Sequence, residues 1–323
     1  MLSLLKGTDP TKLLFGGILL LLSLTSVVGW ALQRMLRHER AAEMLKTLNA
    51  RVRLWWAMCG VFAVAALTGG LGSVLVFGFT SFLLLREFVT ITPTRKGDHR
   101  TLFWVFFIIL PLQYYLLWTG WYGLFIIMIP VYAFLFIPLR MALAGDAHGF
   151  LERAAKIQWA LMICVYCISH APALMKIDFE GGPRVGLRLL LYLCLLVQVN
   201  DVVQLMTARA LDGVPSRNNE SERFRAVGLG AGLVVSTGLG MALSWATPFS
   251  VLQSAAMSVL IVLMGTAGTL CYAAIVQDRG RPGVVVVATR PSMTQRVISL
   301  CFAAPVFFHI ARYYFTAGPG APF

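Results

Sequence analysis

Residues 188–207 read RLLLYLCLLVQVNDVVQLMT, an apolar run with one carboxylate, Asp201, inside it. A helix needs about 20 predominantly apolar residues to cross a bilayer. Similar runs recur along the 323-residue chain, which is 58% hydrophobic and only 13% charged. A soluble domain carries about 25% charged residues. This composition excludes a soluble enzyme, a disordered chain and a fibrous protein, and it predicts an all-α polytopic bundle of membrane helices.

The pattern of apolar runs predicts about ten transmembrane helices joined by short loops. Two of them, 54–68 and 71–85, are short and could form a re-entrant or tilted hairpin. Ten spans use most of the chain, so we expect a single integral membrane domain over residues 1–323. The first apolar stretch has no clear cleavage pattern and is interpreted as a spanning helix. The expected spans are 14–33, 54–68, 71–85, 102–118, 121–138, 157–174, 188–207, 226–246, 250–275 and 297–316.

Lys and Arg residues are concentrated in alternate connections between the expected spans. Of the 27 Lys and Arg residues, 21 lie in 34–53, 86–101, 139–156, 208–225 and 276–296, and four lie on the opposite side. Basic residues accumulate in cytoplasmic loops. We therefore expect an integral membrane protein with both termini outside the cytoplasm and the five basic connections inside. The net charge of +13 is explained by this rule, and no nucleic-acid partner is expected.

Three polar positions within the spans are candidates for function. A carboxylate inside a span costs a few kcal/mol, so Asp201 is either a metal or substrate ligand or a carboxylate that is solvated or paired with Arg209. His309 and Arg312 lie three residues apart and share a helix face. They form either a phosphate-contacting pair or a structural hydrogen-bonding pair. His170 is expected in a helix-terminating turn, with a hydrogen bond to its ring.

Other patterns in the sequence are expected to serve packing. Gly228 and Gly232 form a GxxxG motif, which favours close helix contact. The pair Trp55-Trp56 is expected in an aromatic belt at a membrane interface. The six cysteines lie in or beside apolar runs, so a disulfide or zinc framework is not expected, and the Cys164-x-x-Cys167 pair is interpreted as ordinary packing.

A series of short motifs between residues 49 and 315 resembles the CDP-diacylglycerol synthase (phosphatidate cytidylyltransferase) family, in its shorter bacterial branch. The resemblance leaves residues 1–48 as a variable N-terminal helix and loop. The motifs include Arg86-Glu87-Phe88, Thr92-Pro93-Thr94-Arg95, Asp98-His99-Arg100, Pro111-Leu112-Gln113-Tyr114-Tyr115, Gly145-Asp146, Ser169-His170-Ala171-Pro172, Asp278-Arg279-Gly280, Phe302 to His309, and Arg312-Tyr313-Tyr314.

The resemblance implies a reaction in which CTP condenses with phosphatidate at the cytoplasmic face, releasing diphosphate and CDP-diacylglycerol. Such chemistry needs metal ions held by carboxylates, Mg²⁺ here, and cationic donors on the phosphate oxygens. Asp201 is the expected metal ligand, and Asp278 is a second residual carboxylate. The expected partners are phosphatidate or a similar anionic lipid, CTP if the chain is active, and a second copy in a homodimer. The residues expected to contact phosphate are Arg209, Arg279, Arg296, His309 and Arg312.

The catalytic half of the chain departs from the family pattern. Asn200-Asp201 keeps the aspartate of the family's Ser-Asp pair, but Leu205 stands in place of the following tyrosine. Residues 217–226 preserve nothing of the Ser-Pro-x-Lys-Thr-x-Glu-Gly loop, and Val276-Gln277 replaces a Lys-Arg pair. The chain has no Asp or Glu after Asp278. A two-metal site that holds a triphosphate needs several carboxylates, so we expect cytidylyl transfer to be impaired or absent.

Two functions therefore stay open: a cytidylyltransferase of phospholipid biosynthesis, and an inactive homologue that binds an anionic lipid or a partner. For the second, we expect Asp201, His309 and a basic rim to converge on one cavity at the cytoplasmic leaflet. A positive-inside excess alone also explains the rim. Its members are Arg209, Arg217, Arg223, Arg225, Arg279, Arg281, Arg290 and Arg296.

Overall fold

The structure is a computed structural model that describes residues 10–35, several positions between 49 and 63, 70–92, 95–179, 182, 184–211, 220–278 and 293–316. These residues are helical throughout, apart from turns and one isolated bridge between Phe179 and Thr316. The long uninterrupted helices are α1 (Pro10–Met35), α3 (Gly70–Ile91), α10 (Val185–Leu211), α11 (Glu220–Ala242), α12 (Val251–Asp278) and α13 (Met293–Phe315).

Three further spans are composite helices with a π-helical segment at mid-length. A π segment adds residues to a turn and is rare elsewhere. The sequence gives no signal for these segments. The first span is α4 (His99–Trp104), η2 (Val105–Ile109) and α5 (Leu110–Thr119); the second is α6 (Tyr122–Ile127), η3 (Met128–Ala133) and α7 (Phe134–Ala142); the third is α8 (Phe150–Leu161), η4 (Met162–Cys167), α9 (Ile168–Ala173) and the 3₁₀ turn η5 (Leu174–Lys176).

The all-α membrane bundle expected from the sequence is confirmed, but the count of ten spans is not. Eight helices in the described residues are long and apolar enough to cross a membrane, and a shorter apolar helix covers Ala226–Ala242. The span expected at 71–85 is longer than predicted, because α3 has 22 residues. The span expected at 54–68 lies largely outside the described residues.

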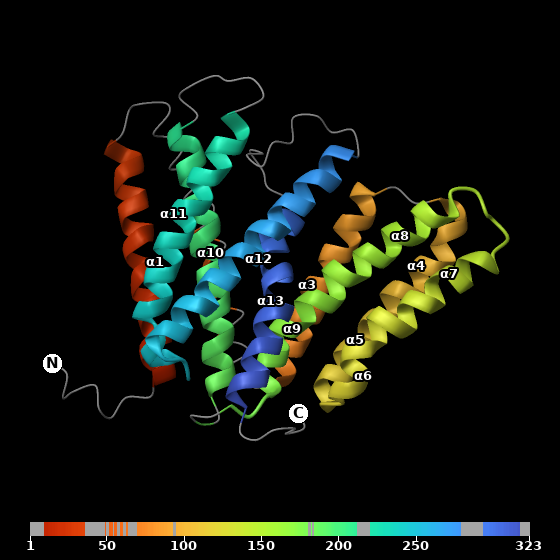
Figure 1. The fold of residues 1–323 in the computed structure, drawn as a ribbon, viewed down its shortest axis with the longest axis horizontal. Coiled ribbons are helices and arrows are strands. Elements are labelled where there is room, and N and C mark those ends of the chain that lie inside the picture. The colour runs from red at the N-terminus through yellow and green to blue at the C-terminus, as the bar shows by residue number, and fades with distance from the viewer. Residues whose placement is uncertain are drawn as a thin grey trace.

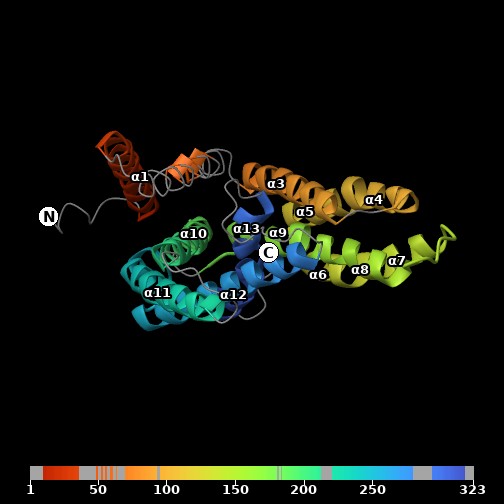
Figure 2. The same cartoon turned by 90° about the horizontal axis from the view of Figure 1, so that it is seen from above.

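The helices form two groups that meet at α13. Helices α10, α11 and α12 pack against one another on one side, and α3 to α9 form an elongated arm on the other (Figure 2). Helix α13 contacts α10 and α12 in the first group and α3 and α9 in the second. Residues of α13 therefore have neighbours from both groups.

From α3 onward successive spans run in opposite directions, so their ends gather at two sides of the bundle (Figure 1). We call the side drawn at the top of Figure 1 the basic end: α1, α3, α7, α10 and α12 end there. Arg34, Arg100 and Arg140 lie at this end of their helices. Helix α1 begins and helix α13 ends at the opposite end (Figure 1). Exposed aromatic residues mark the opposite end, where Trp121 is 63% and Tyr313 80% exposed, as expected for an interfacial belt.

A tight turn at Gly120 reverses the chain between α5 and α6. Gly120 has φ 75°, a left-handed conformation that glycine adopts without a steric penalty. Its N–H donates to Leu117 O at 3.3 Å, and the N–H of Trp121 donates to Leu116 O at 3.1 Å. These bonds cap the end of α5, so the two helices can lie antiparallel.

At the basic end of the arm, an ion network joins α8 to the turn that precedes it and to the residue that precedes α4. Arg153 of α8 donates from Nε to both oxygens of Asp98, at 3.0 and 3.1 Å, and from Nη1 to Asp146 Oδ2 at 2.9 Å. Nη1 also donates to the carbonyl of His148. Asp98 is fully buried and Arg153 is 7% exposed. This network fixes the connection between α7 and α8 against the start of α4.

Candidate functional site

The carboxylate of Asp201 lies at the interface between α10 and α13. Its side chain is half-buried. The hydroxyl of Ser299, on α13, donates to Oδ1 at 3.0 Å and to Oδ2 at 3.1 Å. Asp201 lies ten residues before the last residue of α10, which is about 15 Å of helix rise from the basic end. A carboxylate at this depth requires polar partners, and the structure supplies them.

Amide and hydroxyl side chains extend this site towards α11 and α12. Gln204 Nε2 donates to Asn200 Oδ1 at 3.0 Å and to Thr266 Oγ1 at 2.8 Å. Asn200 is 1% exposed, and its Nδ2 has no hydrogen-bond partner. We call Asn200, Asp201, Gln204, Thr266 and Ser299 the Asp201 cluster. The sequence analysis missed Gln204, Thr266 and Ser299, although Asn200 and Gln204 are polar residues four apart inside an apolar run.

Close contact between α10 and α11 shapes one wall of the cluster. Gly232 faces the side-chain amide of Asn200 so closely that a Cβ at position 232 would overlap it. Gly228, one turn earlier, lies beside the backbone of Gln204. The packing role predicted for the GxxxG motif is therefore confirmed, and the motif makes room for the buried amide.

Among the predicted phosphate contacts whose side chains the structure describes, Arg296 lies nearest to the cluster along the chain. It precedes Ser299 by three residues on α13 and so lies on the same helix face, one turn closer to the basic end. Arg209 follows Asp201 by eight residues on α10, about 12 Å of helix rise, and its side chain is outside the described part of the chain. Arg279 is also outside it.

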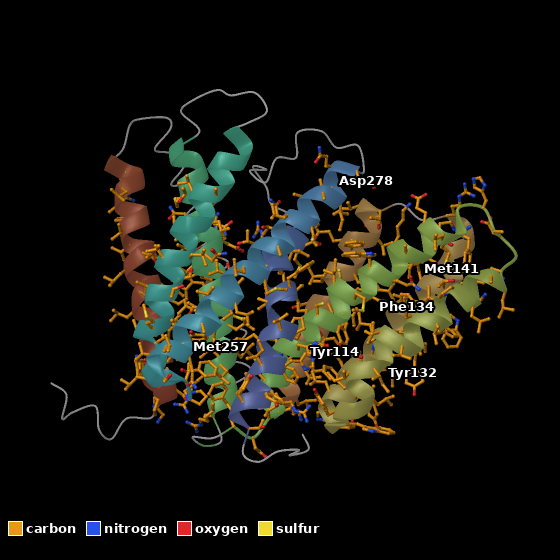
Figure 3. All side chains as sticks on the ribbon, viewed as in Figure 1. Tyr114, Tyr132, Phe134, Met141, Met257 and Asp278 are labelled. Carbon is orange, nitrogen blue, oxygen red and sulfur yellow. The ribbon has the colours of Figure 1, made fainter. Side chains whose placement is uncertain are left out.

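Asp278 does not join Asp201. It follows Thr266 of the cluster by twelve residues on α12, which corresponds to about 18 Å along the helix. It is exposed at the basic end, far along α12 from Met257 (Figure 3). Asp278 is thus separated from the Asp201 cluster by the α12 segment from residue 266 to residue 278, so the two carboxylates do not meet at one metal site.

His309 and Arg312 lie towards the opposite end, so the expectation of one shared cavity with Asp201 is wrong. His309 is ten residues beyond Ser299 on α13, about 15 Å further from the basic end. The guanidinium of Arg312 stacks 3.2 Å from the ring centroid of Tyr122, and His309 Nδ1 lies 3.4 Å from the Tyr122 hydroxyl. These contacts agree with the structural interpretation of the pair.

His170 belongs to the same aromatic group at the opposite end. Its Nδ1 donates to the carbonyl of Tyr166 at 2.8 Å, and its ring centroid is 5.3 Å from that of His309. Both the hydrogen bond and the position near a helix end were expected: His170 lies in the last turn of α9, where it is fully buried. All six cysteines are unpaired thiols.

The Asp201 cluster does not fit the pair of divalent metals that the family's reaction implies. Both Asp201 oxygens accept from Ser299, and the other four members of the cluster carry neutral amides or hydroxyls. Within the described part of the chain, His, Cys, Asp and Glu residues nowhere gather in a metal-binding group of three. Mg²⁺ prefers near-octahedral oxygen sites built on carboxylates and phosphates. This donor set suits hydrogen bonding to a ligand better than metal ligation.

Comparison with known proteins identifies the family. The Cytidylyltransferase family matches residues 49–314, most of the chain. The chain belongs to this family, as the sequence motifs predicted. A curated relative, YnbB of Escherichia coli K12, described as an uncharacterized protein, is 28% identical over 274 residues, which cover 82% of this chain and 88% of the relative. No solved structure matches the chain.

Proposed function

We propose that this member of the cytidylyltransferase family binds the phosphate of a phosphatidate-like lipid at the basic end of α10–α13 and transfers no cytidylyl group at an enzymatic rate. The observation that carries the proposal is the arrangement around Asp201: its carboxylate accepts from Ser299, and the other described members of the cluster are neutral amides and hydroxyls. Within the described residues the cluster has one carboxylate, whereas a metal-assisted transfer needs several.

The charge distribution supports a lipid at this end. Arg296 lies one turn from Ser299 on the same face of α13, and the connections at this end carry most of the chain's Lys and Arg residues. By the positive-inside rule this end faces the cytoplasm of a bacterial inner membrane. Anionic lipids of that leaflet are attracted by about 1 kcal/mol per Lys or Arg near the surface.

A second candidate is an active phosphatidate cytidylyltransferase of phospholipid biosynthesis. The retained Asn200-Asp201 pair and the extent of the family match favour it. In that case carboxylates from outside the described residues would have to complete a metal site with Asp201.

Lipid binding by the purified protein tests the proposal. Phosphatidate, phosphatidylserine and phosphatidylglycerol are compared in nanodiscs at two salt concentrations. We expect phosphatidate to bind best and to resist moderate salt, because partly buried charge pairs are screened less than exposed ones. Equal binding of all three lipids that disappears with salt would reduce the site to a generic positive surface.

A pair of variants localises the site. Arg296→Gln is expected to weaken phosphatidate binding about ten-fold or more, since it removes a charge-assisted contact beside the cluster. The control is Arg100→Gln, which removes the same charge from an exposed position on α4 at the same end. Equal losses in the two variants would contradict a site at the cluster.

A further inference from the structure

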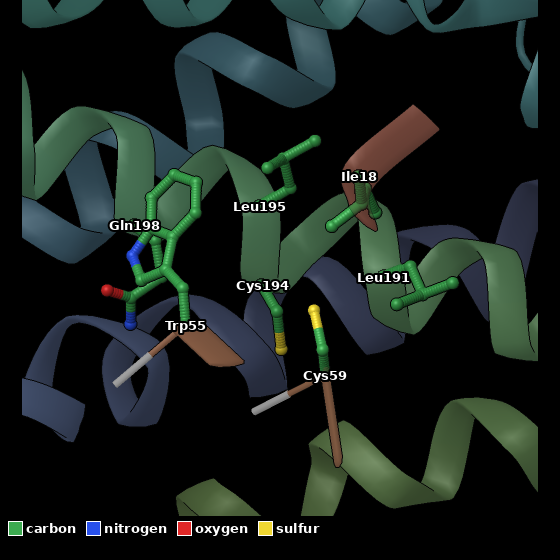
Figure 4. Close-up of a pocket in the computed structure, with 7 residues that line it drawn as sticks. All are labelled: Ile18, Trp55, Cys59, Leu191, Cys194, Leu195 and Gln198. Atoms are coloured by element: carbon green, nitrogen blue, oxygen red, sulfur yellow. The ribbon is translucent and has the colours of Figure 1, made fainter. Parts of the chain in front are cut away.

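A groove runs along α10 on the side that faces α1. It is a shallow, open groove lined by Ile18 of α1, by Trp55 and Cys59, and by four residues of α10, and the empty space along it, about 340 Å³, includes the open surroundings at its mouth. Figure 4 shows Ile18 and Leu191 at one end, Trp55 and Gln198 at the other, and the two cysteine side chains between them. The lining residues on α10 are Leu191, Cys194, Leu195 and Gln198.

The position of the groove limits what can occupy it. It lies between two helices that are long and apolar enough to cross a membrane, Pro10–Leu32 and Val185–Thr207. Leu20, Leu21 and Leu24 of α1 are 47–65% exposed, as expected for side chains that face lipid. Polar ligands are excluded at this depth by their desolvation cost. A hydrocarbon chain is the occupant that the surroundings supply.

The groove is aligned with the Asp201 cluster. From Leu191 to Gln198 it extends on the order of 10 Å along α10, in the direction of the basic end. Gln198 precedes Asp201 by three residues, so the two lie one above the other on α10. An occupant that continues past Gln198 therefore reaches the cluster and, beyond it, Arg296.

The end of the groove nearest the cluster presents an unused hydrogen-bond donor. The indole nitrogen of Trp55 is buried and has no hydrogen-bond partner. An indole N–H only donates, and leaving it unpaired in a buried place costs about 1–3 kcal/mol. An ester carbonyl is the acceptor that a phospholipid carries between its acyl chain and its phosphate.

We propose that the groove holds one acyl chain of the lipid whose phosphate binds beside the Asp201 cluster, with the Trp55 N–H donating to the ester carbonyl of that chain. The inference rests on the proposed function, which it extends from the headgroup to the tail. Helix α1 precedes residues 49–314, the part that matches the family, so one wall of the groove is built by a segment outside the shared fold.

Binding of long-chain and short-chain phosphatidate tests the inference. Leu195→Trp fills the groove, and Leu20→Trp makes the same change at a 65% exposed position of α1. We expect Leu195→Trp to weaken binding of dioleoyl phosphatidate at least ten-fold and to change binding of the soluble dihexanoyl form by less than two-fold. Leu20→Trp should change the binding of neither form. Trp55→Phe keeps the ring and removes the donor, and it is expected to weaken dioleoyl binding about five-fold.

The outcomes separate the two proposals. Unchanged dioleoyl binding in both Leu195→Trp and Trp55→Phe overturns the groove while the headgroup site stands. A change of oligomeric state in Leu195→Trp with unchanged lipid binding assigns the groove to a second copy of the chain and also overturns the inference. Failure of the unsubstituted protein to bind either form of phosphatidate refutes the proposed function, and the inference falls with it.

Discussion

Replacement of Gly232 by alanine should damage the Asp201 cluster from the neighbouring helix. A Cβ at this position overlaps the side-chain amide of Asn200, which is 1% exposed and hydrogen-bonded to Gln204. Overpacking a buried contact costs about 1–3 kcal/mol, and the displaced hydrogen bond about 1 kcal/mol. The higher helix propensity of alanine returns up to about 1 kcal/mol. We expect a net destabilisation of about 1–3 kcal/mol.

A matched control lies two residues away on the same helix. A Cβ at Gly230 meets no atom within 4 Å, so Gly230→Ala gains helix propensity with no steric cost. The assay is unfolding in mixed detergent micelles, followed by helical circular dichroism, together with phosphatidate binding by both variants. Gly232→Ala should unfold at lower denaturant and bind the lipid more weakly, whereas Gly230→Ala should match the parent or exceed it. Equal stability of the two variants would refute the assigned contact between α11 and Asn200.

Two other predictions concern the fold. Arg153→Met leaves the fully buried Asp98 carboxylate without its ion-pair partner, so the free energy of unfolding should fall by about 3–5 kcal/mol. The control Lys156→Met breaks an i,i+4 pair with exposed Glu152 on the same helix and should lower it by about 0.5 kcal/mol. Similar losses of stability in the two variants would contradict the buried contact between Arg153 and Asp98. In a background without native cysteines, a cysteine at Leu143 should be labelled from the cytoplasmic side of sealed vesicles and one at Trp121 from the other side. Both residues are exposed, and Leu143 follows the end of α7 whereas Trp121 precedes the start of α6, at the other end of the same span. Labelling of both from one side would refute the alternation of spans.

The sequence predicts the helices well because a span is decided by composition along one segment. The run at 188–207 corresponds to α10 (Val185–Leu211), which extends beyond the expected span by three residues at its start and four at its end. The error at 71–85 has a physical cause. Glu87 looks like the end of an apolar span, but its carboxylate accepts from the backbone N–H of Thr294 at 2.9 Å. The backbone N–H groups in the first turn of α13 thus stabilise the negative charge of Glu87, so α3 can continue past this residue inside the bundle.

The candidate site was predictable only in part, because it depends on the register between distant spans. Asp201 was identified from its depth, yet its partner Ser299 lies 98 residues away in the sequence, and nothing local in the sequence pairs them. The misplacement of His309 was avoidable. Alternating spans put the end of the last span on the less basic side, which is where His309 and Arg312 contact Tyr122.

Cytidylyl transfer by the purified protein tests the central claim most directly. Protein in nanodiscs that contain phosphatidate is incubated with CTP and Mg²⁺, and CDP-diacylglycerol and diphosphate are both quantified, with Asp201→Asn as the matched variant. The account predicts that the unsubstituted protein binds phosphatidate and that its product formation does not exceed that of Asp201→Asn. Multiple turnovers that require Mg²⁺ and disappear in Asp201→Asn would contradict it and establish the chain as a working cytidylyltransferase.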